Sequence, residues 1–205
     1  MIEEKENRMG VMPVGKLLFS MSTPMVISFL VQSLYNIVDS IFVARYSPDA
    51  LAAVSLAYPI QILMIAVSVG TGVGVNALLS RLLGEGKKDR AKVTADNAVL
   101  LAIMASIAFA IFGAIATKAF FDAQTNSESI RSLGYSYLSI VTIFSFGLIL
   151  EVTYERILQS TGKTIYNMIT QGIGAIINII LDPILIFGLL GAPKMGVAGA
   201  AIATV

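Results

Sequence analysis

The chain has 205 residues, of which 56% are hydrophobic and 13% are charged, and its formal net charge is +1. An ordinary soluble domain carries about 25% charged residues, so this composition and several apolar runs of about 20 residues predict a polytopic helical membrane protein. The sequence contains no cysteine and no histidine, which excludes disulfides, thiolate metal sites and imidazole chemistry. The balanced charge predicts no general attraction to nucleic acid.

The pattern of apolar segments predicts an all-α bundle with five full transmembrane helices and the start of a sixth. After a cytosolic lead-in at residues 1–13, we expect the bundle to occupy 14–205, with helices at about 14–44, 51–83, 93–120, 132–158, 165–187 and 197–205. Pro24 should bend the first helix and Pro183 should interrupt the fifth. Gly70 and Gly74 should let the second helix pack closely.

The last predicted segment, 197–205, reaches only about 13 Å, against a hydrocarbon core of about 30 Å. We therefore expect this chain to be part of a longer protein. Basic residues predict its orientation, since cytosolic loops are enriched in Lys and Arg. Five of them cluster in residues 81–92, on the same predicted side as the N-terminus. This distribution predicts a multi-pass protein of the plasma or inner membrane with a cytoplasmic N-terminus.

Polar side chains form a stripe on the first predicted helix. Gln32, Asn36 and Asp39 are spaced i, i+4, i+7, which places them on one helix face. A carboxylate at membrane depth is costly, so it normally faces a protein interior or a water-filled cavity. A lone polar residue in such a helix can also cap a kink or bond a neighbour. The combination here predicts a functional face.

The fifth predicted helix carries a matching stripe, with Asn178 one turn before Asp182 and Gln171 two turns before that. Counting residues from the helix ends puts both aspartates at the same depth. The two carboxylates, with amide and hydroxyl oxygens, would suit Na⁺ or a shared proton. The predicted cation-coupling layer contains Asp39, Asn36, Asn178, Asp182 and Thr204, and its Na⁺ ligands would be Asp39, Asn178 and Asp182. Gln32, Tyr35 and Gln171 are predicted to line the substrate cavity.

Two further acidic residues, Glu151 and Glu155, lie near the predicted cytosolic end of the fourth helix. The sequence leaves three interpretations open. They could pair with Arg156, reach water, or support gating.

Several short segments together resemble the multidrug and toxic compound extrusion (MATE) family. They are residues 34–43 after Pro24, 51–55 with Pro59, 70–74, 83–86, 157–162, 178–183 and 196–204, in the family's order. The resemblance implies two six-helix bundles that open alternately to either side and export drugs in exchange for Na⁺ or H⁺. It also implies that Asp39, Asn178, Asp182 and Thr204 form the cation site. The sequence departs from the family in length, because only the N-terminal bundle is present.

The sequence thus predicts secondary active efflux of organic cations or amphipathic toxins, and not an enzyme. No cofactor is expected beyond Na⁺ or H⁺ as coupling ion. The expected partners are an organic cation or drug, membrane lipid and a C-terminal six-helix half in the same full-length chain. Two alternatives remain: a flippase of a lipid-linked precursor with the same architecture, and a non-transporting membrane scaffold. A flippase should line its cavity with basic residues, which the predicted helix interiors lack.

Overall fold

The computed structural model describes residues 12–205 and contains only helices within that range. The long helices are α2 (Val14–Tyr46), α3 (Pro48–Gly84), α4 (Lys88–Ile115) and α8 (Thr164–Phe187). The shorter ones are α5 (Thr117–Gln124), α6 (Glu128–Ile143), α7 (Phe146–Ser160), the 3₁₀ turn η1 (Leu189–Gly191) and α9 (Val197–Thr204). By length and hydropathy, α2, α3, α4 and α8 can each cross a membrane, and α6 with α7 can form a fifth, bent span.

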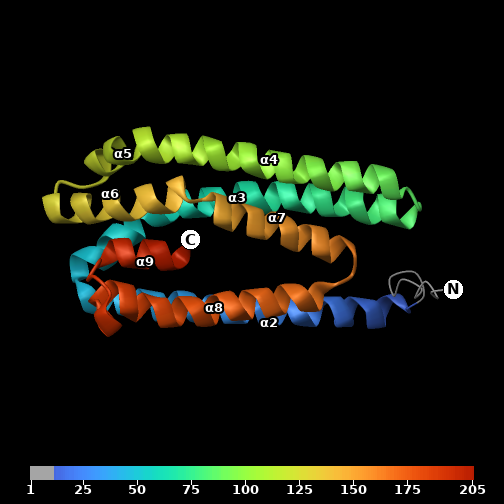
Figure 1. Cartoon of the computed structure of the whole chain (residues 1–205), viewed down its shortest axis with the longest axis horizontal. Helices are drawn as coiled ribbons and strands as arrows, with labels where there is room; N and C mark the ends of the chain where they lie inside the picture. Colours follow the sequence, from blue (N-terminus) through green and yellow to red (C-terminus); the bar gives the residue numbers. More distant parts are fainter. Residues whose placement is uncertain (1–11) are drawn as a thin grey trace.

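The helices form two layers (Figure 1). Helices α2 and α8 run alongside each other in one layer, and α3, α4, α6 and α7 form the other. The short helix α9 lies between them and packs against both α6 and α8. We call the end with residues 85–87 and 161–163 the basic end, and the end with Ser47 and residues 188–196 the opposite end.

Local chemistry explains where the helices begin and end. The Ser47 hydroxyl accepts a hydrogen bond from the Asp49 amide at 3.1 Å, and Pro48 opens α3 at the position where its missing N–H costs nothing. At the other boundary, Gly188 ends α8 in the left-handed conformation that glycine adopts without strain.

The main apolar core lies near the opposite end, where α9 inserts between the layers. Its members include Tyr137, Leu138 and Ile186, together with a row of alanines on α3 and α9. Small side chains at these positions let the helices approach closely. A smaller cluster of Leu79, Leu82 and Ala91 joins α3 to α4 at the basic end. The space between the layers is therefore filled at the opposite end and remains available for a cavity toward the basic end.

Three helix boundaries differ from the sequence prediction. The predicted helix 93–120 is divided at Ala116, and 132–158 is divided at residues 144–145 with a bend of 44°. Near the second break, the Thr142 hydroxyl donates to the Leu138 carbonyl at 2.6 Å, a local bond of the kind that bends helices. Conversely, α8 continues through Pro183, because loss of one backbone donor does not end a helix whose C-terminal turns are held by neighbouring backbone. The Met195 amide donates to the Leu185 carbonyl at 2.9 Å.

Candidate functional site

The two intramembrane aspartates lie together near the opposite end of the bundle. Asp182 is fully buried, and neither of its carboxylate oxygens has a hydrogen-bond donor within the described part of the chain. Asp39, on the facing helix α2, is close enough to Asp182 for their charges to interact, and its Oδ1 is also buried without a donor. Burying an unpaired charge is costly, so this pair requires a proton or a cation.

Asn178 connects the acidic pair to α9. Its Nδ2 donates to the Ala203 carbonyl at 3.0 Å, while its Oδ1 is buried and unpartnered. Thr204, the next residue on α9, donates its hydroxyl to the Ala200 carbonyl at 2.9 Å. Gly199 allows this arrangement, since a Cβ there would lie 2.6 Å from the Leu185 carbonyl carbon of α8. The predicted residues Asp39, Asp182, Asn178 and Thr204 are thus brought together by α2, α8 and α9.

Tyr137 and Gln61 also belong to this region, although no sequence pattern singles them out. Tyr137 of α6 is buried, its hydroxyl accepts a hydrogen bond from Gln61 Nε2 at 3.0 Å, and it lies against Thr204 and near Asp39. A tyrosine in an apolar helix is common, and its partner is 76 positions away. Only the fold brings them together.

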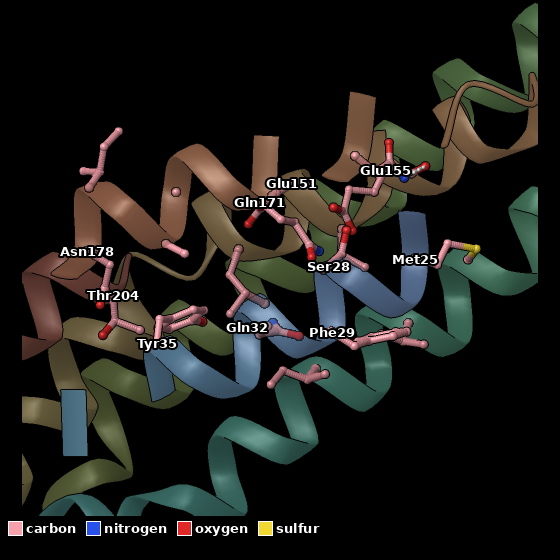
Figure 2. Close-up of a pocket in the computed structure, with 18 of the residues that line it drawn as sticks. Met25, Ser28, Phe29, Gln32, Tyr35, Glu151, Glu155, Gln171, Asn178 and Thr204 are labelled. Carbon is pink, nitrogen blue, oxygen red and sulfur yellow. Dashed lines mark hydrogen bonds between the residues drawn. The ribbon is translucent and has the colours of Figure 1, made fainter. Parts of the chain in front are cut away.

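A cavity of about 400 Å³ extends from this cluster toward the basic end. Figure 2 shows its polar side chains in a row, from Asn178, Thr204 and Tyr35, through Gln32, Gln171 and Glu151, to Ser28 and Glu155. The three residues predicted for the substrate cavity, Gln32, Tyr35 and Gln171, all line it. Asp39 and Asp182 are not among its lining residues, but both are close enough to Tyr35, which lines it, for their charges to act on that side chain. Asn36, predicted for the cation-coupling layer, is exposed and does not line the cavity.

The wall of the cavity near the basic end is built by α2, α3, α7 and α8. Arg156 of α7 donates from Nη1 to Gln159 Oε1 at 2.8 Å, and its carbonyl accepts from Asn76 Nδ2 at 3.2 Å. The close approach of α3 depends on Gly72, where a Cβ would lie 2.6 Å from Arg156 Cγ. The prediction for Gly70 and Gly74 was wrong, because a Cβ at either would meet open space.

The oxygen atoms around Asp182 suit a hard monovalent cation. Four buried oxygens have no hydrogen-bond donor among residues 12–205: both carboxylate oxygens of Asp182, Oδ1 of Asp39 and Oδ1 of Asn178. Oxygen atoms from carboxylates and amides are the ligands that hard cations prefer. The residues present therefore fit the ion that the sequence predicted. Alternatively, the two carboxylates could share a proton.

The apolar helices and this buried acidic site define the class as a helical membrane protein with several spans. The family model described as MatE matches residues 24–184, more than half of the chain. The chain belongs to the MatE family. Its all-α fold is that of the N-terminal half of MATE transporters.

Two curated relatives illustrate the range of the family. The chain is 32% identical over 192 residues to a protein of Shewanella oneidensis named FAD transporter, covering 94% of this chain and 42% of that protein. It is 34% identical over 196 residues to the multidrug export protein MepA of Staphylococcus haemolyticus, covering 93% and 42%. Among solved structures, the MATE multidrug transporter DinF-BH superposes with a TM-score of 0.88 at 30% identity, covering 95% and 43%. The chain thus spans about two fifths of the length of these relatives.

Proposed function

We propose that the complete protein containing this chain exports organic cations or amphipathic toxins in exchange for Na⁺ or H⁺. One observation carries the proposal: Asp182 is fully buried near Asp39, and neither of its carboxylate oxygens has a hydrogen-bond donor in the described part of the chain. Such a pair binds a cation readily and is destabilised when both groups are ionised without one. The names of the multidrug relatives support export as the direction of transport.

In this proposal Asp39, Asp182 and Asn178 hold the coupling ion, and Thr204 contributes its hydroxyl oxygen to the same layer. The ion offsets one of the two negative charges and lies between them, so the bundle conformation that brings the carboxylates together is favoured while it is bound. An ion can shift a conformational equilibrium only through different affinities for the two states. A state in which α2 and α8 separate would lose part of the ligand set and release the ion. Pro24 is a suitable bending point in α2, because it cannot donate a backbone hydrogen bond to the preceding turn.

Transport requires more than this chain provides. We propose a second six-helix half in the same full-length protein, since the relatives are more than twice as long. The two halves would enclose the substrate path between them. We also propose that the N-terminus is cytoplasmic and that the protein resides in the plasma or inner membrane, as the concentration of Lys and Arg at the basic end favours.

A second candidate is export of a flavin dinucleotide, favoured by the relative named FAD transporter. Its diphosphate would be an anionic substrate. Against it, the described cavity carries Glu151 and Glu155 with one arginine, Arg156, so its charge favours cations. Basic residues in the second half could reverse that balance, and the same assay distinguishes the two substrates.

The test uses the complete protein in proteoliposomes, loaded with a fluorescent organic cation or with FAD. Release is followed under an imposed Na⁺ gradient and then under a pH gradient, for the wild type, Asp39→Asn and Asp122→Asn. The last variant is a matched control, because Asp122 is an exposed carboxylate that pairs with Arg131 at 3.2 Å. Gradient-driven release that Asp39→Asn abolishes and Asp122→Asn preserves supports antiport. Release that ignores both gradients and the Asp39 change contradicts it.

A further inference from the structure

The cavity contains a second acidic group, remote from the aspartate pair. Glu155 lines the part nearer the basic end, is only 7% exposed, and has an Oε1 buried without any hydrogen-bond donor. Glu151, one helical turn earlier, lines the same cavity but is exposed (Figure 2). The two carboxylates thus differ in environment although they share one face of α7.

Helix α8 presents amide oxygens to this group. Asn167 is 3% exposed, and its Nδ2 donates to the backbone carbonyl of Glu155 at 3.0 Å, which leaves its Oδ1 buried and unpartnered. One turn further along α8, Gln171 lies against the Glu155 side chain, and its Oε1 is also buried without a donor. Three unpartnered oxygens from a carboxylate and two amides therefore line one short stretch of the cavity.

The neighbouring cation does not satisfy them. Arg156 directs Nη1 to Gln159 at 2.8 Å, and no ion pair joins Arg156 to Glu151 or Glu155 in the part of the chain that the structure describes. Its stem is held against Gly72 of α3, where the contact is close. The pairing of these glutamates with Arg156 that the sequence left open is therefore absent here. With both glutamates ionised, this stretch would have a net negative charge even with Arg156 included.

We propose that Glu155 and Glu151, with Asn167 and Gln171, form a second binding position for a monovalent cation in this cavity. Along α8, Gln171 and Asp182 are eleven residues apart, about 16 Å at 1.5 Å per residue, so one small ion cannot contact both groups. The ligand is either the cationic group of a transported compound or a second alkali ion. The inference extends the proposed function by assigning cation selectivity to the described half of the protein, and rests on it for the identity of the cargo.

The test measures binding rather than transport. The complete protein, purified in detergent, is titrated with a fluorescent rhodamine cation, with an uncharged rhodamine of the same size, and with ²²Na⁺. The variants are Glu151→Gln with Glu155→Gln, Glu151→Gln alone, and Glu128→Gln as a control. Glu128 begins α6, is exposed, and lies outside the cavity. Gel filtration and melting temperature show whether each variant is folded.

If the position binds the cargo, the double variant should weaken binding of the cationic dye by about tenfold or more, with the uncharged dye and ²²Na⁺ unchanged. If it binds an alkali ion, the double variant should lose one ²²Na⁺ per protein, with dye affinity unchanged. Either result supports a cation-binding position, and which of the two occurs identifies the cation that it binds. Wild-type binding of all three probes by the double variant overturns the proposal.

If the double variant does not fold, Glu151→Gln alone provides the test, because Glu151 is exposed and its replacement removes no buried contact. This single variant should weaken binding of the same cation by about threefold or more, and unchanged binding overturns the proposal in that case. The outcome is also separate from the transport assay. A protein that binds cations through Glu155 but shows no gradient-driven release would retain this site and contradict the proposed antiport. Gradient-driven release by the wild type, with unaltered cation binding in the glutamate variants, would support the proposed antiport and contradict this second site.

Discussion

Asn178 Nδ2 donates to the Ala203 carbonyl at 3.0 Å, which fastens α8 to α9 directly beside the buried Asp182 carboxylate. The same side chain leaves its Oδ1 facing the interior without a donor. The amide nitrogen thus links two helices, and under the proposed function the amide oxygen would be a ligand of the coupling ion.

Replacing Asn178 by Ala should affect both functions. The Ala203 carbonyl would lose its donor, and the cost of a buried unsatisfied group is about 1–3 kcal/mol. The variant should also need about tenfold more Na⁺, or a steeper pH gradient, to reach half-maximal release of a fluorescent cation. Thermal unfolding and proteoliposome release measure the two effects. Release with wild-type ion dependence from a destabilised Asn178→Ala protein would leave Asn178 a structural residue only.

The predictable part of this site follows from the constant rise of an α-helix. Residue counts alone place Asp39, Asp182 and Thr204 at one depth, and the structure brings them together. Periodicity is less informative for Asn36. At 100° per residue it lies about 60° around α2 from Asp39, which is enough to move it from the interior to the exposed side. Spacing therefore predicts the direction of a helical face, but not which residues at its margin are buried.

Other features depend on contacts that no local pattern records. The bend between α6 and α7 accompanies a hydroxyl bond within one turn, and a threonine at that position is common in straight helices. The Gln61–Tyr137 hydrogen bond joins α3 to α6. Likewise, Gly72 and Gly70 are indistinguishable in sequence, and only the position of Arg156 separates them.

Replacing Asp182 by Asn should remove a buried charge that needs a cation. In a buffer without Na⁺ at alkaline pH, we expect the variant to melt at a higher temperature than the wild type. Saturating Na⁺ should stabilise only the wild type, by about 2.7 kcal/mol at one hundred times its Kd. A higher melting temperature of the variant with no response of the wild type to Na⁺ would instead indicate proton coupling. Equal stability and equal Na⁺ responses of the two proteins would contradict the site.

Glu85 should show a pH effect at the basic end, outside the membrane-spanning helices. Hydrogen bonds from Lys87 at 2.6 Å and from Arg81 at 2.8 Å lower the pKa of Glu85 from 4.5 to about 2. Because the pKa is lower in the folded state, the stabilising contribution is present above pH 4.5 and is lost as the pH falls toward 2. Glu85 is exposed, so 1 M salt, with a Debye length of about 3 Å, should reduce the shift. An NMR titration of its carboxyl carbon measures this, and an ordinary pKa at low salt would contradict the ion pairs.

Gly72→Ala should disturb the wall of the cavity near the basic end. The new Cβ would lie 2.6 Å from Arg156 Cγ, so Arg156 must shift and strain the Asn76 bond to its carbonyl. We expect a loss of about 1–3 kcal/mol in thermal unfolding, as is usual for overpacking. Gly70→Ala is the matched control, because its Cβ would meet no atom within 4 Å. A Gly72→Ala protein that melts at the wild-type temperature would show that α3 can move away freely.

Gly199→Ala should separate α9 from α8, because the added Cβ would lie 2.6 Å from the Leu185 carbonyl carbon and 2.7 Å from its oxygen. Backbone atoms cannot turn aside as a flexible side chain can, so α9 itself must move, and the Asn178–Ala203 hydrogen bond should lengthen with it. We expect lower stability and weaker ²²Na⁺ binding in this variant. Gly172→Ala on α8 is the control: its Cβ would meet no atom within 4 Å, and alanine favours the helix by about 0.5–1 kcal/mol. If Gly199→Ala binds ²²Na⁺ as the wild type does, the position of α9 does not determine the ion site.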